Sequence, residues 1–172
     1  MAEEKTIEEL VLHEYRLTVR NLLLSSGQGI VANSSPRHAT IILEEMIRGA
    51  KTSFIASAEQ MSGEVWTDEV LRLLCEAKRR NVVIRLLVEK KCVPLAEGRL
   101  PNELVGCIRK AVDGHCDETF LNLAVMDGVA YRLELDKKTK EAAFCANGAE
   151  SAAVMSDWFN REFVIAERLE VA

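Results

Sequence analysis

The spacing of apolar side chains divides the chain into helical and extended segments. Apolar positions that recur every three or four residues predict helices, and short apolar or β-branched runs predict strands. Helices are expected at residues 6–25, 35–49, 64–80, 102–111 and 149–167. Strands are expected at residues 29–33, 52–57, 82–88, 120–126, 129–135 and 142–146. The two kinds of element alternate over most of the chain.

This alternation indicates the fold class. Strands that alternate with helices are typical of parallel sheets whose crossover helices cover both faces. Residues 82–88 are almost wholly apolar, as a buried parallel strand requires. Asp127-Gly128 predicts a tight hairpin between two of the last three strands, which adds antiparallel pairing. We therefore predict an α/β fold with a mixed, largely parallel sheet and helices on both faces.

The length of the chain and the absence of long linkers and repeats indicate its domain organisation. The chain has 172 residues, a usual length for one domain, and contains no internal repeat, low-complexity stretch or long linker. A single domain over residues 1–172 is therefore expected. The first helix, within residues 1–27, precedes a glycine-containing break and is the one candidate appendage. The pattern leaves open whether that helix packs on the core.

Composition narrows the environment and the partners. The net charge of −5 argues against a general nucleic-acid binder, although a local basic patch stays open. The N-terminus lacks a signal-peptide pattern, and no apolar run approaches the ~20 residues of a membrane span. The odd number of cysteines and their spacing favour reduced thiols in the cytoplasm, without membrane contact. These cysteines are Cys75, Cys92, Cys107, Cys116 and Cys145.

Several segments resemble the phospholipase D superfamily. Residues 46–55 and 77–87 are similar to the helix–strand units that open its repeats, and residues 144–163 are similar to its closing strand and helix. The likeness covers most of the chain beyond about Ala32 and implies a phospholipase D-like half. Single-motif members of that family pair two halves, which implies a homodimer. The middle domain of certain archaeal sugar-responsive transcription regulators shares this layout without the chemistry.

The family signature, His-x-Lys-x4-Asp, is degenerate in this chain. Phe120 stands at the histidine position, Asn122 at the lysine position, and Asp127 fits the aspartate. The nearest counterpart of the asparagine in the family's Gly-Ser-x-Asn stretch is Asn147. Phenylalanine has no lone pair with which to attack phosphorus, and asparagine carries no charge to offset a phosphoryl oxygen. The motif is therefore interpreted as vestigial and without catalytic residues; the alternative is ordinary strand residues in a fold that never had it.

Other reactive side chains give weaker signals. His38, at the start of a predicted helix, is a candidate anion ligand, as is the basic run Lys78, Arg79 and Arg80. A capping histidine and a basic helix C-terminus are the simpler readings. His115-Cys116-Asp117 is reactive in composition, but neighbours in an extended segment point opposite ways. No spacing predicts a metal site or a cofactor.

The sequence is compatible with three functions. The first is a non-catalytic phospholipase D-like module that forms a homodimer and binds another macromolecule, most simply a protein. The second is a phosphodiesterase or nuclease that uses His38 or His115 as a relocated nucleophile. The third is a ligand-sensing regulatory domain. Nucleic acid is a partner that the net charge does not favour.

Overall fold

The structure is a computed structural model and describes residues 6–112 and 120–169. Its helices are α1 Ile7–Ser25, α2 Pro36–Gly49, α3 Asp68–Arg79, α4 Val93–Ala96, α5 Asn102–Val105 and α6 Ala149–Ile165. Its strands are β1 Ile30–Asn33, β2 Ser53–Met61, β3 Val83–Cys92, β4 Ile108–Lys110, β5 Leu123–Met126, β6 Ala130–Glu134, β7 Ala142–Cys145 and β8 Glu167–Arg168. In the described ranges, no helix has both the length and the apolar composition of a transmembrane span.

The strands form one mixed sheet in the order β1-β7-β6-β5-β2-β3-β4-β8. The chain crosses over between β2, β3 and β4, which pair in parallel. The remaining neighbours pair antiparallel. The predicted mixed α/β architecture is confirmed, but the parallel part is limited to the adjacent strands β2, β3 and β4 because the last third of the chain returns through hairpins.

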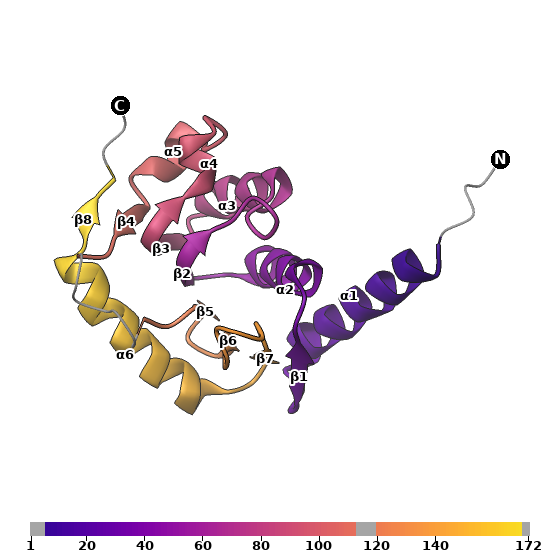
Figure 1. The fold of residues 1–172 in the computed structure, drawn as a ribbon. Coiled ribbons are helices and arrows are strands. Elements are labelled where there is room, and N and C mark those ends of the chain that lie inside the picture. Colours follow the sequence, from indigo (N-terminus) through magenta and orange to yellow (C-terminus); the bar gives the residue numbers. More distant parts are fainter. Residues whose placement is uncertain (1–5, 113–119, 170–172) are drawn as a thin grey trace.

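Helix α1 lies against α2 by one face and extends beyond the rest of the molecule (Figure 1). Its Val19 is fully buried, whereas Ile7 is 82% exposed. An ion cluster joins the two helices: Arg16 and Arg20 of α1 both donate to the buried carboxylate of Glu45 on α2. Burial raises the pKa of Glu45, but the hydrogen bonds from Arg20 and Arg16 outweigh this and hold it below the ordinary value.

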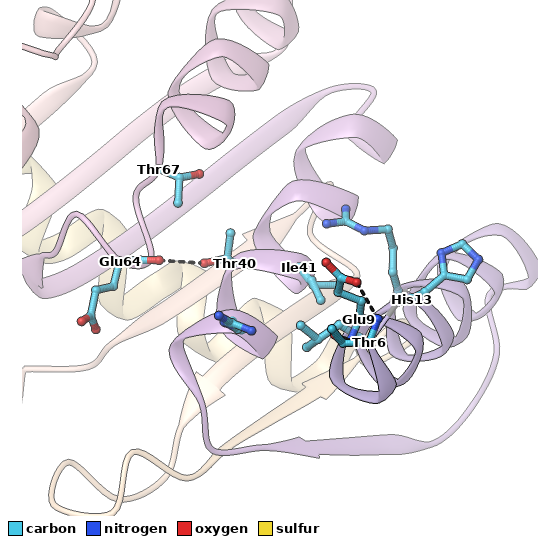
Figure 2. A pocket seen from close by; sticks show the side chains of 10 residues that line it. Thr6, Glu9, His13, Thr40, Ile41, Glu64 and Thr67 are labelled. Carbon is cyan, nitrogen blue, oxygen red and sulfur yellow. Dashed lines mark hydrogen bonds between the residues drawn. The ribbon is translucent and has the colours of Figure 1, made fainter. Parts of the chain in front are cut away.

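The groove between α1 and α2 is open and polar. It encloses about 1030 Å³ and is lined from both helices and from the loop before α3. Figure 2 shows Glu9 and His13 of α1 on one side and Thr40 of α2 on the other. Thr6 N–H donates to the Glu9 carboxylate at 2.8 Å, and the Thr40 hydroxyl donates to the Glu64 carbonyl at 3.1 Å. These polar groups are therefore satisfied within the groove.

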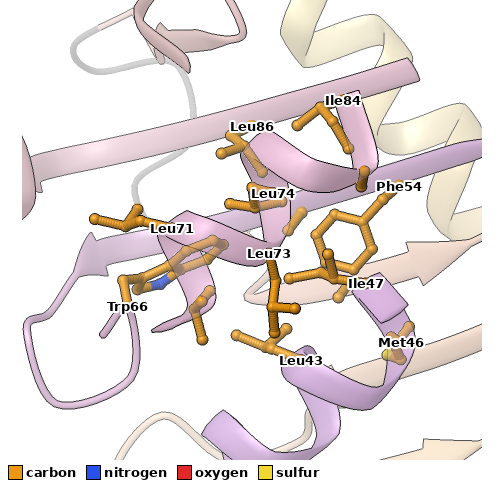
Figure 3. Close-up of a cluster of buried hydrophobic side chains, with 14 of the residues drawn as sticks. Leu43, Met46, Ile47, Phe54, Trp66, Leu71, Leu73, Leu74, Ile84 and Leu86 are labelled. Atoms are coloured by element: carbon orange, nitrogen blue, oxygen red, sulfur yellow. The ribbon is translucent and has the colours of Figure 1, made fainter. Parts of the chain in front are cut away.

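Two apolar layers hold helices on opposite faces of the sheet. On one face, side chains of α2 and α3 pack with those of β2 and β3 (Figure 3). This layer includes Ile47, Phe54, Leu74 and Leu86. On the other face, α6 buries its own aromatic side chains against β2, β3 and β5. The expectation of helices on both faces is confirmed, and β5 lies between the two layers.

Several expected elements have different bounds: α3 begins at Asp68 rather than at residue 64, and β2 and β3 extend to Met61 and Cys92. Residues 102–111 were predicted as one helix, but α5 ends at Val105 and β4 begins at Ile108. The free edge of β3 explains this change, since Leu86 N–H donates to the Cys107 carbonyl and Ala111 N–H donates to the Val88 carbonyl. The strand expected at residues 120–126 begins only at Leu123.

Candidate functional site

Phe120, at the histidine position of the degenerate motif, lies in the apolar layer under α6. Its side chain is 1% exposed. Its ring meets the ring of Trp158 edge to face, with centroids 5.5 Å apart. Such aromatic pairs are favourable beyond the area they bury. Phe120 is therefore a core residue on the face of the sheet that α6 covers.

Asn122, at the lysine position, lines a cleft on the other face, beside α2. Its side-chain oxygen accepts from the Glu59 N–H at 2.6 Å, and its amide nitrogen donates to the Glu134 carboxylate at 2.8 Å. The Ser57 hydroxyl donates to the carbonyl of Leu121 at 2.6 Å. These side-chain bonds hold the segment ahead of Leu123, where β5 begins, while the Asn122 carbonyl still accepts from the Glu134 N–H at 2.9 Å. They also place Asn122 and Phe120 on opposite faces.

Asp127 joins the β5–β6 hairpin to the start of β2. Its carboxylate accepts from the N–H groups of Lys51, Thr52 and Ser53 at 3.0, 2.8 and 2.9 Å, and from the Thr52 hydroxyl at 2.9 Å. Both Asp127 and Gly128 have positive φ, 53° and 68°, so the predicted tight hairpin turn is present. Burial raises the Asp127 pKa, but the hydrogen bonds from Ser53, Thr52 and Lys51 outweigh it and hold the pKa below its ordinary value.

The other predicted site residues lie apart from Asn122. His38 stacks on the Tyr15 ring, with centroids 4.2 Å apart. Asn147 is exposed, and its amide donates to the Ser26 carbonyl at 3.3 Å. His115-Cys116-Asp117 lies outside the described residues. In the described ranges, no group of three or more His, Cys, Asp or Glu side chains could hold a metal ion.

The basic run at the end of α3 is engaged with neighbouring groups. Lys78 donates to the Glu103 carbonyl at 2.5 Å, and Arg79 pairs with the Glu103 carboxylate. Arg80 donates to the Ile47 carbonyl at 3.0 Å. These contacts tie α3 to α5 and to the end of α2. They give the three residues a structural role that the sequence pattern did not distinguish from anion binding.

The cleft beside Asn122 lies between the N-terminal end of α2, the last residues of β2 and the strands β5 and β6. It encloses about 430 Å³, within the range of small-molecule sites. Polar side chains in its lining include Ser57, Glu59, Gln60, Asn122, Arg132 and Glu134. Arg132 was missed from the sequence. The signal for it was a charged residue between two apolar residues, Tyr131 and Leu133, within a predicted strand.

The fold resembles those of several known proteins. No protein-family model and no curated protein sequence matches the chain. Solved structures do match, and they include phospholipase D family members, so the chain has a phospholipase D-like fold. The phospholipase D family member Nuc from Salmonella typhimurium is 14% identical, with a TM-score of 0.56, over 84% of this chain and 99% of Nuc. NucT from Helicobacter pylori is 10% identical, with a TM-score of 0.57, over 83% of this chain and 99% of NucT.

A third neighbour is TrmBL2, an archaeal chromatin protein described as having a novel mode of DNA binding. It is 14% identical, with a TM-score of 0.63, and the match covers 95% of this chain. The chain spans 65% of the length of TrmBL2. At these identities the likeness concerns the fold.

We predict that Asp127→Asn destabilises the chain by about 2–4 kcal/mol, because the charged acceptor of four hydrogen bonds is replaced by a neutral one. Asparagine has the same shape and tolerates positive φ, so the turn itself is preserved. Urea unfolding at neutral pH measures the change. Asp136→Asn is the matched control, because its carboxylate accepts only from Lys138 and Thr139 in an exposed turn.

The pH dependence gives a second reading of the same variant. A carboxyl group whose pKa is lowered by folding stabilises the protein above its unfolded pKa, and this stabilisation is lost as pH falls through the folded pKa. The difference between the parent and Asp127→Asn should therefore be complete at neutral pH and shrink below the ordinary Asp pKa of 3.8. A difference that does not vary with pH, or one equal to that of Asp136→Asn, contradicts the assignment.

Proposed function

We propose that the chain is a cytosolic, non-catalytic module with the phospholipase D-like fold, which self-associates and binds another macromolecule. One observation carries the non-catalytic part: the side chains at the two vestigial motif positions lie on opposite faces of the sheet. Phe120 packs under α6, whereas Asn122 lines the cleft beside α2. A nucleophile and a phosphoryl-binding cation must converge on one phosphorus atom, and these two positions do not converge.

The alternative of a relocated histidine has less support. His38 does not line the cleft, and its ring is stacked on Tyr15. Asp127 satisfies backbone groups at the start of β2, so its carboxylate is not positioned as the partner of a catalytic base. A binding role requires none of these groups to react.

Self-association is proposed through the surface that adjoins Asn122 and the residues after Asn147. The first turns of α6 belong to this surface. Val154 there is 71% exposed and is therefore accessible to a partner. The cytosolic assignment is supported by the free, buried thiols of Cys75, Cys92, Cys107 and Cys145.

A protein is the partner class that the charge distribution favours. The net charge is −5, and the basic run of α3 is held by intramolecular contacts. TrmBL2 binds DNA with a related fold, which keeps nucleic acid as the second candidate. The hydrogen bond from Lys90 and the nearby charges of Lys90, Lys137 and Lys140 lower the pKa of Glu59. These three lysines are the local basic group that a nucleic acid would contact.

Restoring the motif residues should not restore catalysis. In the double variant Phe120→His and Asn122→Lys, the histidine would enter the apolar layer under α6, away from the cleft. We expect no turnover of bis(p-nitrophenyl) phosphate above that of the parent chain, and a loss of about 2–4 kcal/mol in the free energy of unfolding. Circular dichroism verifies that the variant is folded under the assay conditions. Turnover by the parent that His38→Ala abolishes would contradict the non-catalytic proposal.

The proposed self-association predicts a dimer in light scattering at high protein concentration. Val154→Lys should weaken the dimer about tenfold or more, because it places a charge in the buried part of the interface. Val164→Lys is the matched control: Val164 is 75% exposed at the other end of α6. A parent chain that stays monomeric, or equal effects of the two variants, excludes this interface.

The macromolecular partner is tested by affinity capture of the tagged chain from native lysate, with and without nuclease treatment. We expect one stoichiometric protein that survives the nuclease. Partners that disappear after nuclease treatment would replace the protein proposal with nucleic-acid binding. Recovery of the chain alone would contradict both.

A further inference from the structure

Arg132 lies in the lining of the cleft, on the central part of β6. Its Nε and Nη2 atoms both donate to one acceptor, the side-chain oxygen of Asn33, at 3.3 and 3.2 Å. For Nη1, no hydrogen-bond acceptor is present in residues 6–112 and 120–169. Part of the guanidinium is therefore available to a molecule in the cleft.

The positive charge of Arg132 is not matched by an ion pair within the described part of the chain. Glu134, two positions along the same strand, accepts from Asn122 at 2.8 Å and lies 3.5 Å from Lys140. Tyr15 also lies near Arg132, but burial raises its pKa to about 12 against the effect of Arg132, so it stays neutral. Burial lowers the Arg132 pKa, and Glu134 and Tyr15 offset this only in part.

An arginine in this state destabilises the empty protein. Moving a charge out of water costs several kcal/mol unless a counter-charge or a full set of hydrogen bonds replaces the solvent. The arginines that pair with carboxylates in this fold illustrate the usual solution, such as Arg16 and Arg20 at Glu45. The missing counter-charge at Arg132 can be supplied by a ligand, because Arg132 is one of the residues that line the cleft.

The remaining lining of the cleft suits a small molecule. Trp66 and Leu43 contribute apolar surface, and Gln60 contributes an amide. Two of the three carboxylates in the lining have partners of their own: Glu59 pairs with Lys90, and Glu134 binds Asn122, whereas the third belongs to Glu64. Glu59 and Glu134 therefore repel an anion less than free carboxylates would.

We propose that this cleft binds a small molecule through one anionic group, a carboxylate or a phosphate, which takes its hydrogen bonds from Arg132. The guanidinium offers planar donors in a fork that matches both oxyanions. Asn122 lines the same cleft, but the proposed cation comes from β6 and from none of the motif positions. The proposed site goes beyond the proposed function and requires neither a macromolecular partner nor self-association.

Thermal unfolding of the full chain, titrated with inorganic phosphate or with acetate at constant ionic strength, tests this site. Anions this small bind at best in about the millimolar range, and a ligand that binds only the folded state raises the unfolding temperature saturably. We expect saturation with at least one of the two anions, and the stronger response identifies phosphate or carboxylate as the preferred group. In Arg132→Gln, which keeps an amide donor for Asn33, the apparent affinity should fall at least tenfold.

Arg72→Gln is the matched control, because it removes the same charge from an exposed site on α3 and should leave the titration unchanged. A second measurement uses only the parent chain, so it remains valid if the Arg132→Gln variant does not fold. In ¹⁵N spectra, the Nε–H resonance of Arg132 should shift saturably with the anion, and that of Arg85, under α6, should not. The absence of saturation with both anions overturns the proposal, as does an Arg132→Gln response equal to that of the parent.

Discussion

The carboxylate of Asp127 is the contact on which the arrangement of the central strands depends. It receives N–H groups from three consecutive residues at the start of β2, so it holds the β5–β6 turn against that strand. The resulting register pairs Phe54 with Met126 and Ile55 with Val125. A shift by one residue would exchange the two faces of β5 and move its apolar side chains out of both layers. The position that matches the motif aspartate is therefore a structural position in this chain.

The same strand and the segment before it place Phe120 and Asn122 on opposite faces and border the cleft. Residues 123–126 alternate between the layer under α6 and the layer next to α2, as a strand buried on both faces must. Ahead of Leu123 the Asn122 carbonyl still accepts from the Glu134 N–H, and side-chain bonds of Asn122 and Ser57 hold the segment next to β2. Phe120 turns into one layer and Asn122 toward the other. The two side chains therefore lie on opposite faces of the sheet.

Electrostatic contacts differ between two regions of the molecule. At α1 and α2, buried carboxylates are matched by arginines, which attaches a helix that buries few apolar side chains of its own. In the cleft, Arg132 has an amide oxygen as its acceptor and no ion pair among the described residues. The first arrangement stabilises the fold. The second lowers the stability of the empty protein, and this loss of stability is the physical basis for proposing a ligand there.

The sequence by itself determined the main helices and central strands, because apolar spacing and turn residues such as Asp127-Gly128 act within a few neighbours. It also indicated that Phe120 and Asn122 cannot perform the family chemistry, since this follows from their functional groups. Only the tertiary structure decided that Ile108–Lys110 is a strand, because the free edge of β3 supplies its partners. Likewise, the cleft and the exposed part of the Arg132 guanidinium arise where β6 meets α2. Contacts between segments far apart in the sequence form the cleft and place Arg132 there, and no local sequence pattern predicts such contacts.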